Sequence, residues 1–295
     1  MKIAAPLALA AALALPAHAA DSGYVKDVQA WRARADKSLR KDNGWLTLAG
    51  RYVMKQGVNT FGTGKDNDIV FPEGLGPARM GTIDVEPGRV FVKLAPGLTM
   101  EQDGIPMTDK VMGTSLETRD WVSMGRAAFH VIEVNGQYVL RLADNQSEHR
   151  KRFGGRVWYP VKIPYRVNAK FHPYEPQRHI EIVNVIGEVS EEASPGYVEF
   201  QLDGKRQRLD ALEEDGGLFF VFRDRTAGDT TYGAGRFMYI EGKPAANGTV
   251  TLDFNRAYNP PCAFNKYTTC PLPPRENILP VRVEAGEKYP PRKAG

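Results

Sequence analysis

Residues 253–265 of the chain read Asp253-Phe254-Asn255-Arg256-Ala257-Tyr258-Asn259-Pro260-Pro261-Cys262-Ala263-Phe264-Asn265, and residues 270–277 read Cys270-Pro271-Leu272-Pro273-Pro274-Arg275-Glu276-Asn277. This segment leaves a strand-like run, turns at paired prolines and contains the only two cysteines of the chain. Charged and amide side chains gather at its start, close to a candidate covalent bridge. We therefore predict that the segment forms a functional site rather than an ordinary surface loop.

The strand that leads into this segment sorts its side chains by alternation. In an extended run over residues 249–254, successive side chains point to opposite faces of a sheet. The even-numbered apolar residues would pack inward, while Asp253 faces the other way with Asn255 beside it. Residues 235–240 are the expected antiparallel partner. Because the start of one hairpin strand lies near the end of the other, we expect Arg236 to lie close to Asp253 or Asn255.

Polar residues from neighbouring strand ends would join the same site. The candidate set comprises Asp224 and Asp253 as catalytic carboxylates, and Tyr232, Arg236, Asn255 and Arg256 as ligand-binding side chains. In a functional interpretation, the arginines hold an anionic or sugar ligand while one carboxylate acts as general base. In a structural interpretation, the arginines pair with the aspartates and fasten the sheet end to the proline-rich segment. The sequence leaves both interpretations open.

The first twenty residues have the pattern of a secretory signal. Lys2 supplies the positive start, residues 7–15 supply a short apolar core, and Ala17-His18-Ala19 is a small-x-small cleavage pattern. We predict a signal peptide over residues 1–19 and a periplasmic or secreted protein. No membrane span is expected, because no later run approaches roughly 18 apolar residues. In an oxidising compartment, a disulfide between Cys262 and Cys270 is the default expectation.

Charge and motif content argue against several classes of function. The formal net charge is +4, and basic and acidic residues are interleaved. The longest basic run, residues 149–152, is short and lies in a polar connector, so no nucleic-acid binding is expected. Prolines separate His172 from His179 and no third ligand is evident, so no metal site is predicted. Phosphate-loop and nucleophilic-serine motifs are also lacking, and we predict no cofactor.

The periodicity of apolar residues changes early in the chain. One helix is predicted over residues 20–44, where apolar residues recur at near-helical spacing and Asn43-Gly44 provides the stop. From Tyr52 onward, short apolar runs alternate with Gly, Pro, Asn and Asp, as in all-β proteins. The clearest hairpin joins residues 129–134 to residues 137–142 through Asn135-Gly136, which suits a tight primed turn.

These elements predict an all-β fold with an N-terminal helix. We place a small β-sandwich over residues 45–145 and a larger antiparallel β-sandwich or barrel-like domain over residues 155–295. The polar, basic stretch 144–155 forms the boundary between them. The larger domain would end in the motif closed by the cysteines.

Residues 57–64, Gly-Val-Asn-Thr-Phe-Gly-Thr-Gly, and residues 67–72, Asn-Asp-Ile-Val-Phe-Pro, resemble the opening of a forkhead-associated sandwich. The resemblance implies a β-sandwich, which in that family reads phosphothreonine. The arginine expected after the glycine is Thr63 here, and residues 76–81 lack the serine and histidine of the next loop. Phosphopeptide binding is therefore not expected.

A second resemblance covers the whole mature chain. It rests on Asn43-Gly44-Trp45-Leu46 with Leu48, Arg141-Leu142 with Asp144, Asp224 with Thr226, Thr231-Tyr232, Gly235-Arg236-Phe237, and Asp253 to Cys262. With these residues the chain resembles the bacterial and archaeal family named domain of unknown function 1684. That resemblance implies a secreted, β-rich protein and brings no established activity or cofactor.

Taken from the residues, the predicted function is recognition of a small polar or anionic ligand, such as a glycan fragment, in a pocket of the second domain. One alternative is a carboxylate-dependent hydrolase that uses the same pocket. Another is a structural envelope or interaction module. An open cleft with a carboxylate free of arginine would favour the first two, whereas capped carboxylates in a filled cleft would favour the third.

Overall fold

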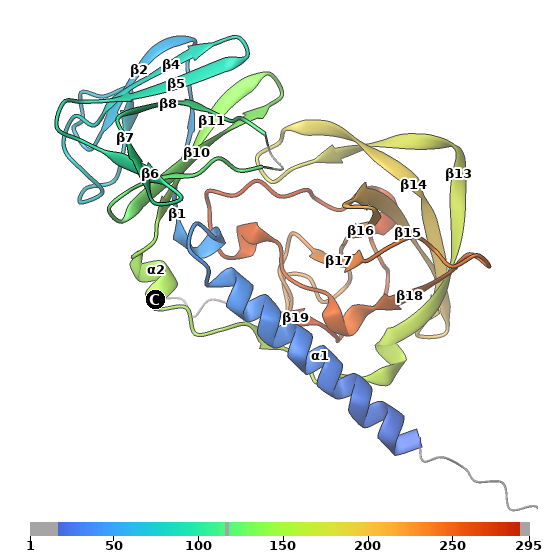
Figure 1. Ribbon diagram of the computed structural model, residues 1–295. Coiled ribbons are helices and arrows are strands. Elements are labelled where there is room, and N and C mark those ends of the chain that lie inside the picture. Colours follow the sequence, from blue (N-terminus) through green and yellow to red (C-terminus); the bar gives the residue numbers. More distant parts are fainter. Residues whose placement is uncertain (1–16, 116–117, 290–295) are drawn as a thin grey trace, which may run out of the picture.

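The computed structural model describes residues 17–115 and 118–289 of the chain, which form a long helix and two β-rich parts (Figure 1). Helix α1 spans Ala17–Leu39, so the predicted N-terminal helix is present and ends before Asn43, which has a positive φ of 57°. Within the described residues, no helix combines the length and apolar character needed to cross a membrane. Of the predicted signal peptide, residues 1–16 lie outside the described part.

The first β-rich part is built from two sheets. One has the strand order β1-β11-β10-β9-β6-β7, and the other has the order β3-β2-β4-β5-β8, with β2 and β3 the parallel pair. The strands are β1 (Leu48–Val53), β2 (Gly57–Gly62), β3 (Ile69–Val70), β4 (Gly81–Glu86), β5 (Arg89–Leu94), β6 (Met100–Gln102), β7 (Ile105–Met107), β8 (Asp109–Met112), β9 (Val122–Met124), β10 (Ala127–Val134) and β11 (Gln137–Asp144).

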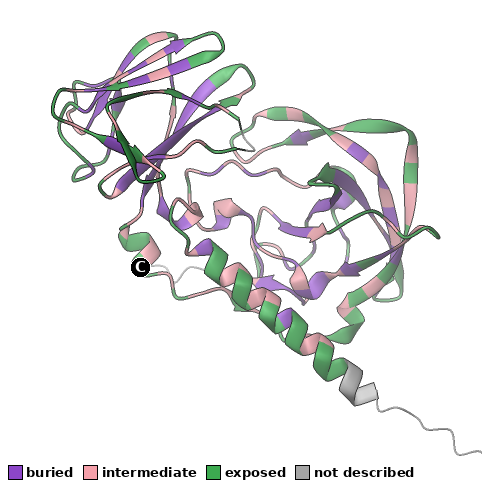
Figure 2. Cartoon of the chain, viewed as in Figure 1, coloured by how far each residue is buried: buried purple, intermediate pink, exposed green. Residues whose placement is uncertain are grey.

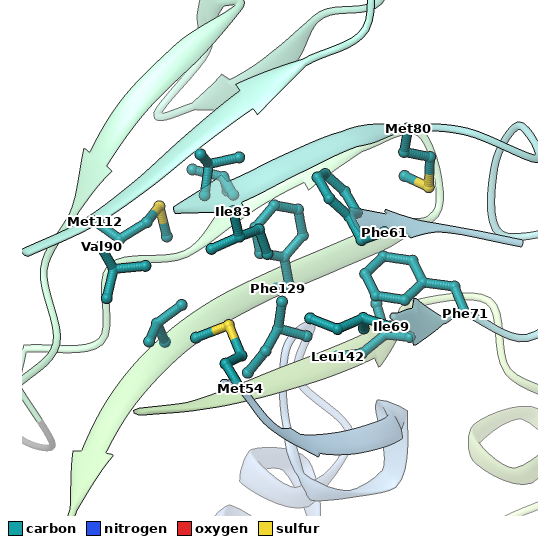
Figure 3. Close-up of a cluster of buried hydrophobic side chains, with 14 of the residues drawn as sticks. Met54, Phe61, Ile69, Phe71, Met80, Ile83, Val90, Met112, Phe129 and Leu142 are labelled. Carbon is teal, nitrogen blue, oxygen red and sulfur yellow. The ribbon is translucent and has the colours of Figure 1, made fainter. Parts of the chain in front are cut away.

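The two sheets share one hydrophobic core. Phe61 and Ile83 from one sheet pack with Phe129 and Leu142 from the other, and all four side chains are fully buried (Figure 3). Alternation explains the arrangement, because every second side chain of these strands points into the space between the two sheets. This leaves the outer face of the β1-β11-β10 sheet free to meet the rest of the molecule.

The hairpin predicted from Asn135-Gly136 is confirmed. Strands β10 and β11 pair antiparallel up to Val134 opposite Gln137. Asn135 and Gly136 have φ values of 50° and 71°, which is the positive-φ pair that a tight primed turn requires.

The second β-rich part is a single curled, half-barrel sheet in the order β17-β16-β15-β14-β13-β18. Its strands are β13 (Arg166–Val183), β14 (Val189–Leu202), β15 (Lys205–Glu214), β16 (Gly217–Phe222), β17 (Arg236–Ile240) and β18 (Thr249–Asp253), and a separate pair consists of β12 (Val157–Trp158) and β19 (Glu287–Lys288). Short helical turns connect these parts: α2 (Glu148–Lys151), η1 (Trp45–Thr47), η2 (Ile163–Tyr165), η3 (Phe254–Arg256), η4 (Pro261–Ala263) and η5 (Arg275–Asn277).

The segment 279–285, called the tail below, fills the half-barrel. Leu279, Val281, Val283 and Ala285 are buried in the same hydrophobic cluster as the inner faces of the strands. Figure 2 shows this concentration of buried residues in the tail and the inner strands, whereas α1 remains largely exposed. The tail is therefore part of the core rather than a surface extension.

The expected pairing of residues 235–240 with residues 249–254 is wrong. Strands β17 and β18 lie at opposite edges of the six-stranded sheet, and β18 pairs with β13 instead. The segment after β18 reaches the other edge, where Tyr258 and Phe237 exchange two backbone hydrogen bonds of 2.9 and 2.8 Å. Residues 253–258 thus bridge the two edges of the curled sheet.

Candidate functional site

Asp224 and Arg236 form a sealed ion pair inside the half-barrel. The Arg236 guanidinium donates to Asp224 Oδ2 at 2.7 Å, to the Val283 carbonyl at 2.9 Å and to the Ala285 carbonyl. Asp224 Oδ1 accepts hydrogen bonds from Thr226 and from the Val283 backbone N–H. Both side chains are 1% exposed, so neither can touch a ligand in this conformation. The pair instead fastens the C-terminal tail to the end of the sheet.

Tyr232 also lies apart from Asp253. Its hydroxyl donates to the Cys262 carbonyl at 3.2 Å, and its ring meets Tyr289 edge to face at 5.0 Å between centroids. Burial, together with the hydrogen bond to Cys262, raises the pKa of Tyr232. This residue holds the cysteine-containing loop against the end of the described chain.

The predicted disulfide between Cys262 and Cys270 is not formed, and both residues are free thiols. The Cys262 backbone N–H donates to Cys270 Sγ at 3.1 Å, and a hydrogen bond between the two thiols lowers the pKa of Cys262 and raises that of Cys270. The cysteines are therefore neighbours, as the sequence suggested, but hydrogen bonds rather than a covalent bond join them.

Asp253, Asn255 and Arg256 do come together, around a residue that sequence reasoning did not select. The Tyr24 hydroxyl of α1 donates to Asp253 Oδ1 at 2.7 Å and accepts from Asn255 Nδ2 at 3.0 Å. Arg256 Nε lies 3.3 Å from Asp253 Oδ2, and Arg166 stacks on the Tyr24 ring at 5.0 Å. Burial and the Asp253 carboxylate raise the pKa of Tyr24, so the phenol stays protonated and donates.

Alternation correctly predicted the orientation of Asp253, but the strand ends at this residue, so Asn255 is placed by the following turn and not by the strand. Val250 and Leu252 of β18 are buried, while Asp253 is directed to the other face, opposite Arg166 of β13. After β18 the chain tightens into η3, and the Asp253 side chain caps this turn by accepting from the Asn255 N–H. Asn255 is fully buried and bonds both backbone groups of Lys162, which fixes the turn in place.

An open groove lies between α1 and the half-barrel. One hollow of about 750 Å³ is lined by Tyr24, Arg166, Asp253 and Arg256, among others. A second hollow of about 580 Å³ continues along the helix toward Trp45. Three aromatic residues, Trp31, Tyr239 and Tyr258, line both hollows, so the two are parts of one groove.

The groove combines aromatic faces with charges of both signs. Trp31 packs against Tyr258 with 6.2 Å between ring centroids, and both rings are partly accessible. Glu214 lies in the Trp45 half of the groove, where desolvation and the nearby Asp215 raise its pKa. No group of three or more His, Cys, Asp or Glu side chains among residues 17–115 and 118–289 could hold a metal ion.

Sequence reasoning missed the contribution of α1 to this groove. Tyr24 lies 229 residues from Asp253, and no local pattern links the two positions. Trp31 is one of the apolar residues within the helix predicted over residues 20–44, and Trp45 is part of the Asn43-Gly44-Trp45-Leu46 motif. The positions were therefore visible in the sequence, but their common location was not.

Replacing Tyr24 with phenylalanine tests the link between the helix and the site. The change removes one hydrogen bond to Asp253 and one from Asn255, so we expect the free energy of unfolding to fall by about 1 kcal/mol. Urea denaturation monitored by circular dichroism would measure it. Tyr197→Phe is the matched control, because the hydroxyl of this half-buried tyrosine has no hydrogen-bond partner among the described residues. Equal losses in both variants would contradict the assigned network.

Comparison with known proteins gives a family resemblance but no activity. Residues 151–288 match the model of a family described as protein of unknown function, DUF1684. A search of curated proteins found no match. The matched region includes Asp253 and the half-barrel, whereas α1 and the sandwich lie outside it.

A solved structure resembles part of the chain. It is the solution NMR structure of an uncharacterized protein from gene locus rrnAC0354 of Haloarcula marismortui. The two chains are 31% identical in sequence, and the match covers 49% of this chain and 81% of the archaeal one with a TM-score of 0.42.

Proposed function

We propose a function from the groove itself, because residues 151–288 match a family, DUF1684, whose function is unknown: the protein binds a small polar or anionic ligand, with a glycan fragment as the best candidate. The main support for this proposal is the open groove beside α1, where three aromatic residues line both of two connected hollows. Volumes of about 580 and 750 Å³ fall within the range typical of small-molecule sites.

The chemistry of the groove suits a ligand with an apolar face and many hydroxyl groups. Aromatic rings offer flat apolar surfaces, on which the C–H face of a sugar ring can pack. Around them, Arg34, Arg166 and Glu241 are exposed and have no ion-pair partner among the described residues. Such groups can form hydrogen bonds with sugar hydroxyls at little cost in lost internal contacts. The periplasmic or secreted location predicted from residues 1–19 would bring the protein to envelope glycans.

Binding is a better proposal than hydrolysis by the predicted carboxylates. Asp224 is sealed from the groove by its contacts with Arg236 and the tail. Asp253 faces the groove but already accepts from Tyr24 and the Asn255 N–H and lies beside Arg256. A general base needs a lone pair directed at the substrate, and the contacts of Asp253 leave little room for one.

We further propose that the forkhead-associated-like sandwich acts as a scaffold. The loops that would read a phosphate in that family bond to each other here: the Thr63 and Gly64 N–H groups donate to the carbonyls of Pro77 and Ala78. Asn67 Nδ2 donates to the Gly64 and Ala78 carbonyls. These donors are already used, which supports the expectation that the sandwich does not bind phosphopeptides.

Ligand screening with one groove variant tests the proposal. We expect at least one envelope-derived glycan fragment to raise the melting temperature of the protein, and Tyr239→Leu to weaken its binding about tenfold or more in isothermal titration. Tyr239 lines both hollows, whereas Tyr197 is a half-buried tyrosine that lines neither, so Tyr197→Leu should retain wild-type affinity. A flat response to all fragments, or equal losses in the two variants, would refute the proposed function.

A further inference from the structure

A third hollow, of about 240 Å³, lies where the sandwich meets residues 261–269 of the proline-rich segment. The sandwich contributes Trp121, His130 and Arg141 to its lining, and the proline-rich segment contributes Pro261, Thr268 and Thr269. Asn43, Trp45 and Arg119 line both this hollow and the Trp45 half of the groove. The hollow is therefore a side chamber of the groove, formed by different elements.

The sandwich has a row of nitrogen-bearing side chains at this chamber, of which His130 and Arg141 line it. Arg141 of β11 lies directly opposite Arg51 of β1 on one side and His130 of β10 on the other. Residues opposite each other in an antiparallel sheet point to the same face. Phe129 and Leu142 fill the inner face of the sheet. The row of Arg51, Arg141 and His130 therefore lies on the outer face, toward residues 261–269.

Positive charge in and beside this chamber is only partly neutralised. Arg51 pairs with Glu188 at 3.2 Å. Arg141 donates only to uncharged groups, the Tyr267 carbonyl and the Thr269 hydroxyl. Among the described residues, neither Arg141 nor Arg119 has a carboxylate within ion-pair distance. Burial and the neighbouring Arg51 and Arg119 charges lower the pKa of Arg141 to about 10, as expected for a cation among cations.

His130 adds an unused polar atom. Its side chain is 4% exposed, and its ring lies 4.2 Å from that of Trp121. The imidazole makes no hydrogen bond within the described residues, and Nδ1 is buried without a partner. Buried polar atoms in proteins are normally paired, so an unpaired one beside a hollow points to a missing ligand group. Burial, followed by Arg119 and Arg141, lowers the pKa of His130 to about 3, so the ring is neutral at pH 7.

We propose that the chamber binds the anionic group of the ligand, a carboxylate, sulfate or phosphate, held by Arg119 and Arg141 with His130 as a further hydrogen-bond partner. Arginine guanidinium groups bind such oxyanions through paired, charge-assisted hydrogen bonds. This inference rests on the proposed function and narrows it: the ligand is an acidic saccharide. Its sugar ring would lie against the aromatic side chains of the groove, and its charge would lie in the chamber.

Three probes separate this inference from the proposed function. Inorganic sulfate tests the chamber alone, cellobiose tests the groove alone, and cellobiouronic acid, which carries a glucuronate residue, tests both. Isothermal titration at constant ionic strength would give the affinities. We expect the acid to bind about tenfold or more tightly than the neutral disaccharide, and sulfate to compete with the acid.

The matched variants are Arg119→Gln and Arg206→Gln. Both arginines are exposed and lack an ion-pair partner among the described residues, but Arg206 lines none of the hollows described above. Arg119→Gln should remove the advantage of the acid and weaken sulfate binding about tenfold, whereas Arg206→Gln should change neither.

Each outcome decides one of the two proposals. Equal affinity for the acid and neutral disaccharides, or a loss with both arginine variants, would overturn the anion chamber and leave the groove proposal standing. Sulfate binding that depends on Arg119, without any saccharide binding, would support the chamber and refute saccharide recognition. Absence of sulfate and acid binding would overturn the chamber outright.

Discussion

Replacing Arg236 with methionine is expected to lower the free energy of unfolding by about 3–5 kcal/mol, the cost of breaking a buried ion pair by removing one partner. The substitution preserves much of the side-chain volume but leaves the Asp224 carboxylate buried without its counter-ion. It also removes the donor from the carbonyls of Val283 and Ala285. Because these carbonyls belong to the tail, the loss should loosen the segment that fills the half-barrel.

Urea denaturation of the purified protein would measure this effect. Arg206→Met is the control, since this exposed arginine has no ion-pair partner among the described residues and should cost less than about 0.5 kcal/mol. Combining Arg236→Met with Asp224→Leu should recover part of the loss, because it removes the unpaired charge. A loss below about 1 kcal/mol in Arg236→Met would show that Asp224 and Arg236 are not a sealed structural pair and would restore Asp224 as a candidate catalytic residue and Arg236 as a candidate ligand-binding residue.

Local patterns in the sequence predicted local structure well. Alternation along residues 249–254 placed Leu252 in the core and Asp253 on the opposite face, and both placements are confirmed. Asn135-Gly136 predicted a tight hairpin turn, which the structure contains. These patterns succeed because they depend only on the geometry of one strand or one turn.

Strand pairing could not be predicted in the same way. Strands that follow each other in sequence often pair, and this expectation placed Arg236 beside Asp253. In the curled sheet, β17 and β18 are opposite edges, so Arg236 instead meets Asp224, twelve residues earlier. Of the two interpretations left open by the sequence, the Asp224–Arg236 pair has the geometry of the structural one. Asp253 and Arg256 also pair, yet they line an open groove.

Part of the anion chamber was within reach of the sequence. A two-residue turn at 135–136 fixes the register of the hairpin, so His130 must lie opposite Arg141. The hairpin does not reveal what covers this face. Residues 261–269 are distant in sequence, and only the folded chain shows that they enclose this face together with Arg119.

Phe254 connects the stability of the half-barrel to the position of the groove residues. Its side chain is fully buried, with ring centroids 5.6 Å from Phe200 and 5.5 Å from Phe222. It begins the η3 turn, which carries Asn255 and Arg256 directly after it. Burial of Phe254 therefore fixes the position from which the neighbouring polar side chains reach α1 and the groove.

Replacing Phe254 with alanine should lower the free energy of unfolding by about 3–5 kcal/mol, through lost apolar burial and the cavity left between Phe200 and Phe222. Phe254→Leu fills most of that space, so its cost should be clearly smaller, about 1 kcal/mol. Urea denaturation gives both values. If η3 positions the site as well as the core, the alanine variant should also lose hydrogen-exchange protection at the Asn255 and Ala257 amides, whose partners lie within the turn. A small and equal cost for both substitutions would mean that the turn is held by its polar contacts alone, since the buried ring would then contribute little to either the fold or the groove.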